Sequence, residues 1–239
     1  IIGKNCTIKE TAFRIMTGKT MNAGQICLAP DYVNIPENKT ADFIDACNDS
    51  VAELYPKLLD NPYYTSIINQ RHFDRIEALL TDAKQKGAKL IEINPQSEDF
   101  SKQNYLKIKP TLVLDVTDDM KIMQDEIFGP ILPIRTYEHI EEVIDYINAH
   151  NRPLGLYYFG KNKKECDYVL NNTTSGGVTI NDVIWHIGQE DLPFGGIGPS
   201  GMGCYHGYDG FLEFSHKKSV FKQTKANMIK LMKMIPPYQ

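Results

Sequence analysis

Apolar residues recur along this chain at two spacings, which together predict helices that alternate with strands. Spacings of three and four residues predict helices at 8–21, 40–55, 69–86, 140–147 and 162–170. Short runs rich in β-branched and aromatic residues predict strands at 32–35, 90–93, 131–134, 155–159 and 177–180. Because strands separated by helices of about ten to fifteen residues usually pair in parallel, this pattern predicts an α/β fold with a largely parallel sheet flanked by helices.

Three segments carry more local signals. Thr7 and Glu10 have the spacing of a capping box, which predicts that their side chains close the first turn of the first helix. Residues 105–115 alternate in polarity but contain Pro110, which is typical of an edge strand or a hairpin arm rather than a central strand. Glycines crowd residues 195–210, and because so many glycines would unravel a helix, we expect a long ordered loop there.

The C-terminal residues have a pattern of their own, although no linker or repeat divides the chain. Ser219-Val220-Phe221 predicts a strand that leaves the domain. A final amphipathic helix would follow it, with one apolar side formed by Met228, Leu231, Met232 and Ile235.

Composition and charge are those of an ordinary globular protein. The net charge of -4 provides no basic excess that would draw the chain to nucleic acid or to a membrane surface, so small molecules and copies of itself are the expected partners. The five cysteines are scattered and form no Cys-x-x-Cys pair, which argues against a disulfide framework or a metal site and favours a reducing compartment, the cytoplasm. No apolar run approaches the ~20 residues of a membrane span. The chain begins without methionine, which suggests a piece of a longer protein.

Cys27 is the strongest candidate for a catalytic nucleophile. Taken alone, a cysteine is more often a small buried hydrophobic residue than a reactive thiol. Cys27, however, follows the helix breaker Gly24 and precedes a strand that starts at Tyr32. Its thiol is therefore expected on a turn between two rigid elements, open to substrate on one side, as covalent catalysis requires.

Two later segments, and one pair of polar residues, are further candidates. Residues 126–130, Glu-Ile-Phe-Gly-Pro, place a carboxylate and an aromatic ring beside a tight turn, although alone they would be a solvated acid and a core residue. The glycine-rich residues 192–203 are not a phosphate-binding loop, because no Lys-Ser/Thr follows them and no Gly-x-Gly-x-x-Gly opens a helix. Asn181-Asp182 follows a strand and has an equally good interpretation as a polar pair that closes it.

These segments resemble motifs of the aldehyde dehydrogenase superfamily. Residues 24–32, Gly-Gln-Ile-Cys-Leu-Ala-Pro-Asp-Tyr, resemble its nucleophile motif and look most like the class 3 branch, which includes fatty, aromatic and coniferyl aldehyde dehydrogenases. Residues 126–130 resemble its cofactor-clamping segment, and residues 192–203 resemble its late glycine-rich loop, which Tyr205-His206-Gly207 continues as in class 3. The motifs occur in the order of the family, and the resemblance covers essentially the whole chain.

The resemblance implies a role for each residue. Cys27 would attack an aldehyde to form a thiohemiacetal and then a thioester, and NAD or NADP would take up the hydride. Glu126 would accept hydrogen bonds from the nicotinamide-ribose hydroxyls, and Phe128 would pack near the nicotinamide. Three residues would belong to the substrate pocket or its floor: Asn181, Phe194 and Tyr205.

The resemblance also implies that some parts of the family's machinery are not matched here. The activating glutamate and the oxyanion-stabilising asparagine of the family have no counterpart in this sequence. Residues 1–239 would thus be a catalytic domain with the aldehyde dehydrogenase fold but without an NAD-binding domain, and the isolated chain is expected to be inactive. Residues 217–239 would supply an oligomerisation strand and a C-terminal helix to a homodimer.

Two other functions compete with this hypothesis. A thiol hydrolase or acyltransferase would pair Cys27 with a histidine base, but His206 is more simply a structural hydrogen-bonding residue, and His186 and His216 belong to no motif. Alternatively, the chain is a non-catalytic dimerisation module that pairs through an exposed strand edge.

Overall fold

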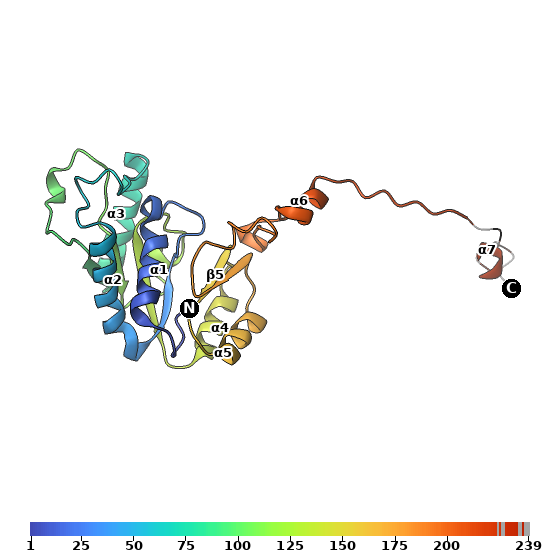
Figure 1. The fold of residues 1–239 in the computed structure, drawn as a ribbon, viewed down its shortest axis with the longest axis horizontal. Coiled ribbons are helices and arrows are strands. Elements are labelled where there is room, and N and C mark those ends of the chain that lie inside the picture. Colours follow the sequence, from blue (N-terminus) through green and yellow to red (C-terminus); the bar gives the residue numbers. More distant parts are fainter. Residues whose placement is uncertain (224, 226–227, 234–235, 237–239) are drawn as a thin grey trace.

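The computed structural model describes residues 1–223, 225, 228–233 and 236 (Figure 1). Its helices are α1 (Ile8–Thr20), α2 (Thr40–Leu54), α3 (Gln70–Gln85), α4 (Ile140–Ala149), α5 (Lys163–Asn172), α6 (Gly207–Glu213) and α7 (Met228–Leu231). Its strands are β1 (Val33–Pro36), β2 (Lys89–Glu92), β3 (Thr111–Leu114), β4 (Ile131–Tyr137), β5 (Gly155–Tyr158) and β6 (Gly177–Ile180). Within these described ranges, no helix is both long and apolar enough to cross a membrane.

The strands form two sheets that the first residues of the chain connect. One sheet has the order β1-β4-β3-β2, in which only the β2–β3 pair is antiparallel, and the other is the parallel pair β5-β6. Ile2 donates its N–H to the carbonyl of Asn34 at 2.8 Å and forms a parallel bridge with Phe159. The predicted α/β fold with a largely parallel sheet is therefore confirmed.

The prediction that residues 105–115 form an edge strand or a hairpin arm is wrong about their place in the sheet. Strand β3 lies between β4 and β2 and pairs with both. Pro110 precedes the strand, so its missing N–H removes no hydrogen bond from the ladder, and its carbonyl accepts a bond from the N–H of Ile93 at 2.8 Å. A proline beside a strand is thus compatible with a central position.

Of the two helix N-termini predicted from capping residues, that of α3 forms as expected and that of α1 does not. Asn69 caps α3 by accepting a hydrogen bond from the N–H of His72 at 3.0 Å, as a residue that opens a helix should. The capping box predicted for Thr7 and Glu10 does not form, because the Thr7 side chain makes no cap bond and Glu10 instead pairs with Arg14 at 3.1 Å.

Two apolar clusters hold the larger sheet between helices. Helices α1 and α2 lie side by side in Figure 1 and bury Met16 and Phe43 against residues of β1 and β4. A second cluster joins Ile76 of α3 to Val113 of β3 and to Ile127. Both helices that bear on the candidate site, α1 and α3, are thereby fixed to the sheet.

The chain leaves this body after α6, as Figure 1 shows. Residues 217–223 are exposed and belong to no strand of the described chain. A strand at Ser219–Phe221 requires a second chain to pair with, so it remains a prediction. The last helix in the described part of the chain is the short α7, and Ile235, predicted on its apolar side, lies outside the described residues.

Candidate active site

The loop that carries Cys27 follows α1 directly and is shaped by three left-handed residues. Asn22, Ala23 and Gly24 have φ angles of 50°, 52° and 73°, which turn the chain sharply away from the helix axis. Cys27 lies on the turn that follows and is exposed. The thiol therefore stands on the surface between a helix and strand β1, where the sequence placed it.

Hydrogen bonds of Gln25 hold this loop in place next to the residues that precede α3. Its side-chain amide donates to the carbonyls of Asn22 at 3.0 Å and Ser66 at 3.1 Å, and its side-chain oxygen accepts from the N–H of Ile68 at 2.9 Å. One side chain thus satisfies three backbone groups. A loop fixed in this way is preorganised before any substrate arrives.

The loop is also packed directly against the segment of residues 126–130. A Cβ atom added to Gly24 would lie 2.3 Å from the carbonyl oxygen of Gly129, so only glycine permits this approach. Asp31 accepts a hydrogen bond from the N–H of Ile127 at 3.1 Å, and the guanidinium of Arg75 donates to the carbonyls of Glu126 and Ile127. The two sequence motifs, about a hundred residues apart, therefore form one rigid unit.

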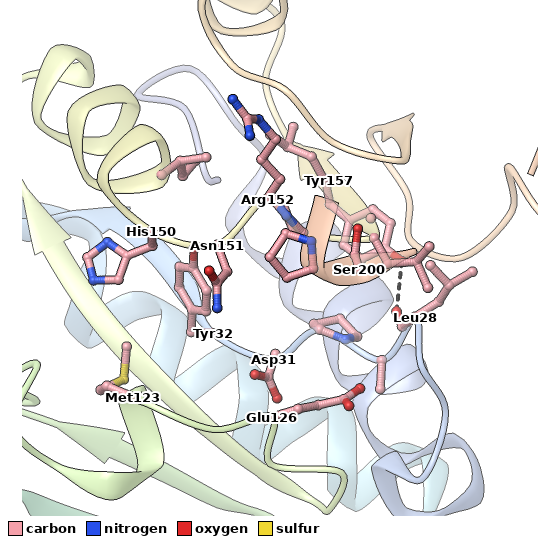
Figure 2. Close-up of a pocket in the computed structure, with 18 of the residues that line it drawn as sticks. Leu28, Asp31, Tyr32, Met123, Glu126, His150, Asn151, Arg152, Tyr157 and Ser200 are labelled. Carbon is pink, nitrogen blue, oxygen red and sulfur yellow. Dashed lines mark hydrogen bonds between the residues drawn. The ribbon is translucent and has the colours of Figure 1, made fainter. Parts of the chain in front are cut away.

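Cys27 and Glu126 line the same cavity, which has a volume of about 510 Å³. Its walls combine apolar and aromatic side chains with a few polar ones, as is typical of a small-molecule site. Figure 2 shows Asp31 and Glu126 near each other on one side of this cavity, with Tyr157 and Ser200 on another. The rest of the lining comes from Ile1, residues 28–30, Tyr32, Asn34, residues 122–125, 146–147 and 150–156, and Pro199.

On the acidic side of the cavity, the pKa values of three groups are shifted from their ordinary values. Burial raises the pKa of Asp31, although Lys19, the Ile127 N–H and Arg75 oppose the rise. Partial removal from water raises the pKa of Glu126, and the neighbouring charge of Asp31 adds to the rise while Lys19 and Arg75 oppose it. Burial lowers the pKa of Lys19 to about 8, against the opposing effect of the two carboxylates. Perturbed groups of this kind collect at functional sites.

Tyr157 links Cys27 to the late glycine-rich loop. Its hydroxyl donates to the carbonyl of Leu28 at 2.7 Å, the residue next to the thiol (Figure 2). Its ring lies 6.2 Å from that of His186, which in turn lies 5.9 Å from the ring of Phe194. Phe194 and Tyr205 exchange two backbone hydrogen bonds and make an edge contact at 5.7 Å. Phe194 and Tyr205 do not line the cavity themselves, but their rings connect through His186 to Tyr157, which does.

The other residues singled out from the sequence lie further from the cavity. Phe128 has a φ angle of 49°, is exposed and does not line the cavity. Asn181 accepts a hydrogen bond from the N–H of Gly160 at 2.8 Å and so ties the ends of β5 and β6 together. His206 makes ring contacts with Phe194 and Tyr205 rather than any contact with Cys27. Within the described residues, no hydrogen bond joins Cys27 to a histidine.

Sequence reasoning assigned no role to Lys19, Asp31, Arg75 or Tyr157. Only Lys19 carried a signal of its own, because it follows Ile15 by four residues and Met16 by three and so continues the apolar face of α1. A lysine in such a position has to be buried or to distort the helix face. The contacts of Arg75 and Tyr157 depend on the topology, which the local pattern does not reveal.

The sequence matches a known protein family over most of its length. The model of the aldehyde dehydrogenase family matches residues 1–220. A probable coniferyl aldehyde dehydrogenase of Caulobacter vibrioides is 55% identical over 238 residues, which are 100% of this chain and 49% of that protein. The chain thus spans about half the length of this curated relative.

Solved structures give the same result. A substrate-bound state of AldH from Staphylococcus aureus shares 36% identity with a TM-score of 0.83, over 98% of this chain and 52% of that one. A betaine aldehyde dehydrogenase from Staphylococcus aureus in complex with NAD+ shares 26% identity with a TM-score of 0.76, over 89% of this chain and 42% of that one. On this sequence and structural similarity, the chain belongs to the aldehyde dehydrogenase family.

Proposed function

We propose that residues 1–239 form the nucleophile-bearing domain of an enzyme that oxidises aldehydes to carboxylic acids with NAD or NADP. The observation that carries this proposal is that an exposed thiol, Cys27, and the carboxylate of Glu126 line one cavity. Cys27 and Glu126 each lie on a segment that is held between rigid elements, as a reaction with a fixed geometry requires.

The proposed reaction begins when the Cys27 thiolate attacks the aldehyde carbon. A C–S bond forms, the π electrons of the carbonyl move to its oxygen, and a tetrahedral thiohemiacetal results. The carbonyl re-forms as the carbon loses its hydrogen with two electrons, which leaves a thioester on Cys27. Water then adds to the thioester, the C–S bond breaks, and the carboxylic acid and the free thiol are released. Sulfur serves both steps, because it is nucleophilic near neutral pH and a good leaving group.

The residues of the cavity fit a nicotinamide cofactor. Among the described residues the Glu126 carboxylate accepts no hydrogen bond, so both of its oxygens are free to accept bonds from ribose hydroxyls. NAD or NADP bound there would accept the hydride that the thiohemiacetal carbon loses. Glu126 would orient the ribose, and the exposed ring of Phe128, two residues further along the chain and outside the cavity lining, would pack near the nicotinamide where the cofactor extends beyond the cavity. The NAD+ complex of the betaine aldehyde dehydrogenase relative supports this choice of cofactor.

An aromatic or long apolar aldehyde, with coniferyl aldehyde as the first candidate, is the proposed substrate. The name of the Caulobacter relative supports it, and so does the row of rings that runs from Tyr157 through His186 to Phe194 and Tyr205. Asn181 would stabilise the floor of the pocket through the ends of β5 and β6. Apolar pockets discriminate weakly between similar side chains, so related aromatic aldehydes would also react.

The proposal extends to the assembly and location of the enzyme. The family's activating glutamate and oxyanion asparagine are not matched in these residues, so we expect no turnover from the 239-residue chain alone. Residues 217–239 would pair two subunits in a homodimer, since the exposed Val220 and Phe221 need a partner surface. All five cysteines are free, which supports a reducing compartment such as the cytoplasm.

The experiment that tests the proposal compares the full-length enzyme with its Cys27→Ser variant. We expect the wild-type enzyme to reduce NAD or NADP in the presence of coniferyl aldehyde, and the variant to lose at least a hundredfold in kcat, because a hydroxyl is a far weaker nucleophile and leaving group than a thiolate. Cys47→Ser, at a buried position that does not line the cavity, is the matched control. Equal activity of wild type and Cys27→Ser would refute the assignment. A thiol hydrolase would instead release acid from a thioester or ester without any cofactor.

A further inference from the structure

Lys19 is a buried charge that the proposed reaction does not use. Its side chain is 1% exposed at the end of α1, where it continues the apolar face of Ile15 and Met16. Within the described chain it donates no hydrogen bond and forms no ion pair within 4.0 Å. A buried ammonium without counter-charges would be strongly unfavourable, so its neighbours must supply the compensation.

Two carboxylates provide this compensation from different segments. Asp31 belongs to the loop before β1, Glu126 to the segment before β4, and both act on Lys19 electrostatically. Among the described residues, the only other cation that acts on both carboxylates is Arg75 of α3, whose guanidinium already donates to the backbone carbonyls of Glu126 and Ile127. Lys19 is thus a buried cation that both acids affect, while Asp31 in turn raises the pKa of Glu126.

Lys19 also lies where the nucleophile loop meets the segment of Glu126. A Cβ atom on Gly24 would meet the carbonyl oxygen of Lys19 at 3.1 Å as well as that of Gly129 at 2.3 Å, so the three backbones converge. Asp31, four residues after Cys27, accepts the hydrogen bond of Ile127 N–H next to Glu126. Protonation of either acid would therefore change the electrostatic environment of both the nucleophile loop and the segment of Glu126.

We propose that Lys19 is a positioning residue that keeps Asp31 and Glu126 ionised together, so that Glu126 remains a hydrogen-bond acceptor in the cavity over the physiological pH range. Without Lys19 the repulsion between the two carboxylates is less compensated, so one of them takes up a proton at a higher pH. Glu126 then loses acceptor capacity as the pH falls. Only the cofactor readout of this inference rests on the proposed function.

The first test measures the dissociation constant of NAD for the full-length enzyme between pH 6 and pH 8. Wild type is expected to vary less than twofold, whereas Lys19→Met, of similar volume but without charge, binds NAD at least fivefold more weakly at pH 6 than at pH 8. Lys19→Arg restores the charge and the flat profile. Lys9→Met is the matched control, because Lys9 lies exposed on the same helix and should behave as wild type.

The second test does not depend on the cofactor. Infrared difference spectra follow the band of protonated carboxyl groups as the pH is lowered, with Asp31→Asn and Glu126→Gln used to assign it. Lys19→Met is expected to show this band at least one pH unit higher than wild type, and Lys19→Arg is not. Identical titrations in Lys19→Met and wild type would overturn the inference, and so would a pH-independent loss of NAD affinity that Lys19→Arg does not restore. Failure of wild type to bind NAD would refute the proposed function and leave the infrared test decisive for Lys19.

Discussion

Replacing Gly24 by alanine tests the contact between the nucleophile loop and residues 126–130. The φ angle of Gly24 is +73°, and an added Cβ atom would lie 2.3 Å from the oxygen and 2.6 Å from the carbon of the Gly129 carbonyl. Ordinary van der Waals contact begins near 3.4 Å, so one of the two backbones would have to move by about 1 Å. Neither backbone is free to do so, because Gln25 and Arg75 fix them by hydrogen bonds.

The magnitude follows from two terms. The left-handed conformation costs an alanine about 1–2 kcal/mol, and overpacking against a backbone costs about 1–3 kcal/mol more. Gly87→Ala is the matched control, because Gly87 has a φ angle of +99° but no atom within 4 Å of its added Cβ. Gly87→Ala should therefore show the first term alone, and Gly24→Ala should be the less stable variant by about 1–3 kcal/mol.

The assay combines stability with function. Thermal unfolding of both variants gives the difference in stability, which for a domain of this size corresponds to roughly 2–4 °C in Tm per kcal/mol. In the full-length enzyme, Gly24→Ala should also raise the KM for NAD and slow alkylation of Cys27, whereas Gly87→Ala should change neither more than twofold. Equal destabilisation by the two substitutions, with an unchanged KM for NAD, would refute the view that these loops form one rigid unit.

Three further predictions concern single side chains. Tyr157→Phe removes the hydrogen bond to the Leu28 carbonyl and should lower the free energy of unfolding by about 1 kcal/mol; an equal loss in the exposed control Tyr63→Phe would contradict this. Iodoacetamide should label Cys27 well before Cys47, because burial raises the pKa of the Cys47 thiol and hides it from the reagent, and peptide mapping that finds Cys47 first would contradict the assignment. Burial lowers the pKa of Lys19 from 10.5 to about 8, so between pH 8 and pH 10.5 the unfolded chain binds more protons than the folded one. The free energy of unfolding of wild type should therefore rise by about 3 kcal/mol relative to Lys19→Met across that pH range. A constant difference between the two proteins in urea unfolding would contradict this.

The sequence predicted the helices and strands better than it predicted which strands pair and which side chains meet. The periodicity located α1 and α3 within a few residues, and turn chemistry correctly placed Cys27 on a turn. It misplaced β3, because a proline beside a strand and one inside it look alike until the hydrogen bonds are known. It also predicted a capping box at Thr7 and Glu10, but Thr7 makes no side-chain cap bond and Glu10 pairs with Arg14.

For the site, the motifs singled out Cys27 and Glu126 as candidates, but only the fold shows that they line one cavity. The contact between Tyr157 and Leu28 spans 129 residues and depends on how β5 lies beside the loop, so no local pattern could reveal it. Lys19 was visible as a lysine on an apolar face, but its meaning required the positions of Asp31 and Glu126. Long-range electrostatics of this kind is fixed by tertiary structure alone.

The central claim, that Cys27 carries the substrate as a thioester, is tested most directly by trapping the acyl-enzyme. The full-length enzyme is mixed with NAD and coniferyl aldehyde, quenched in acid during the first turnover, digested and mapped by mass spectrometry. We expect one adduct, with the mass of the acyl group of the product acid, on the peptide that contains Cys27, and we expect it to be absent from Cys27→Ser. An adduct on any other cysteine, or turnover without an adduct at Cys27 under conditions that trap the thioester of a known aldehyde dehydrogenase, would contradict it.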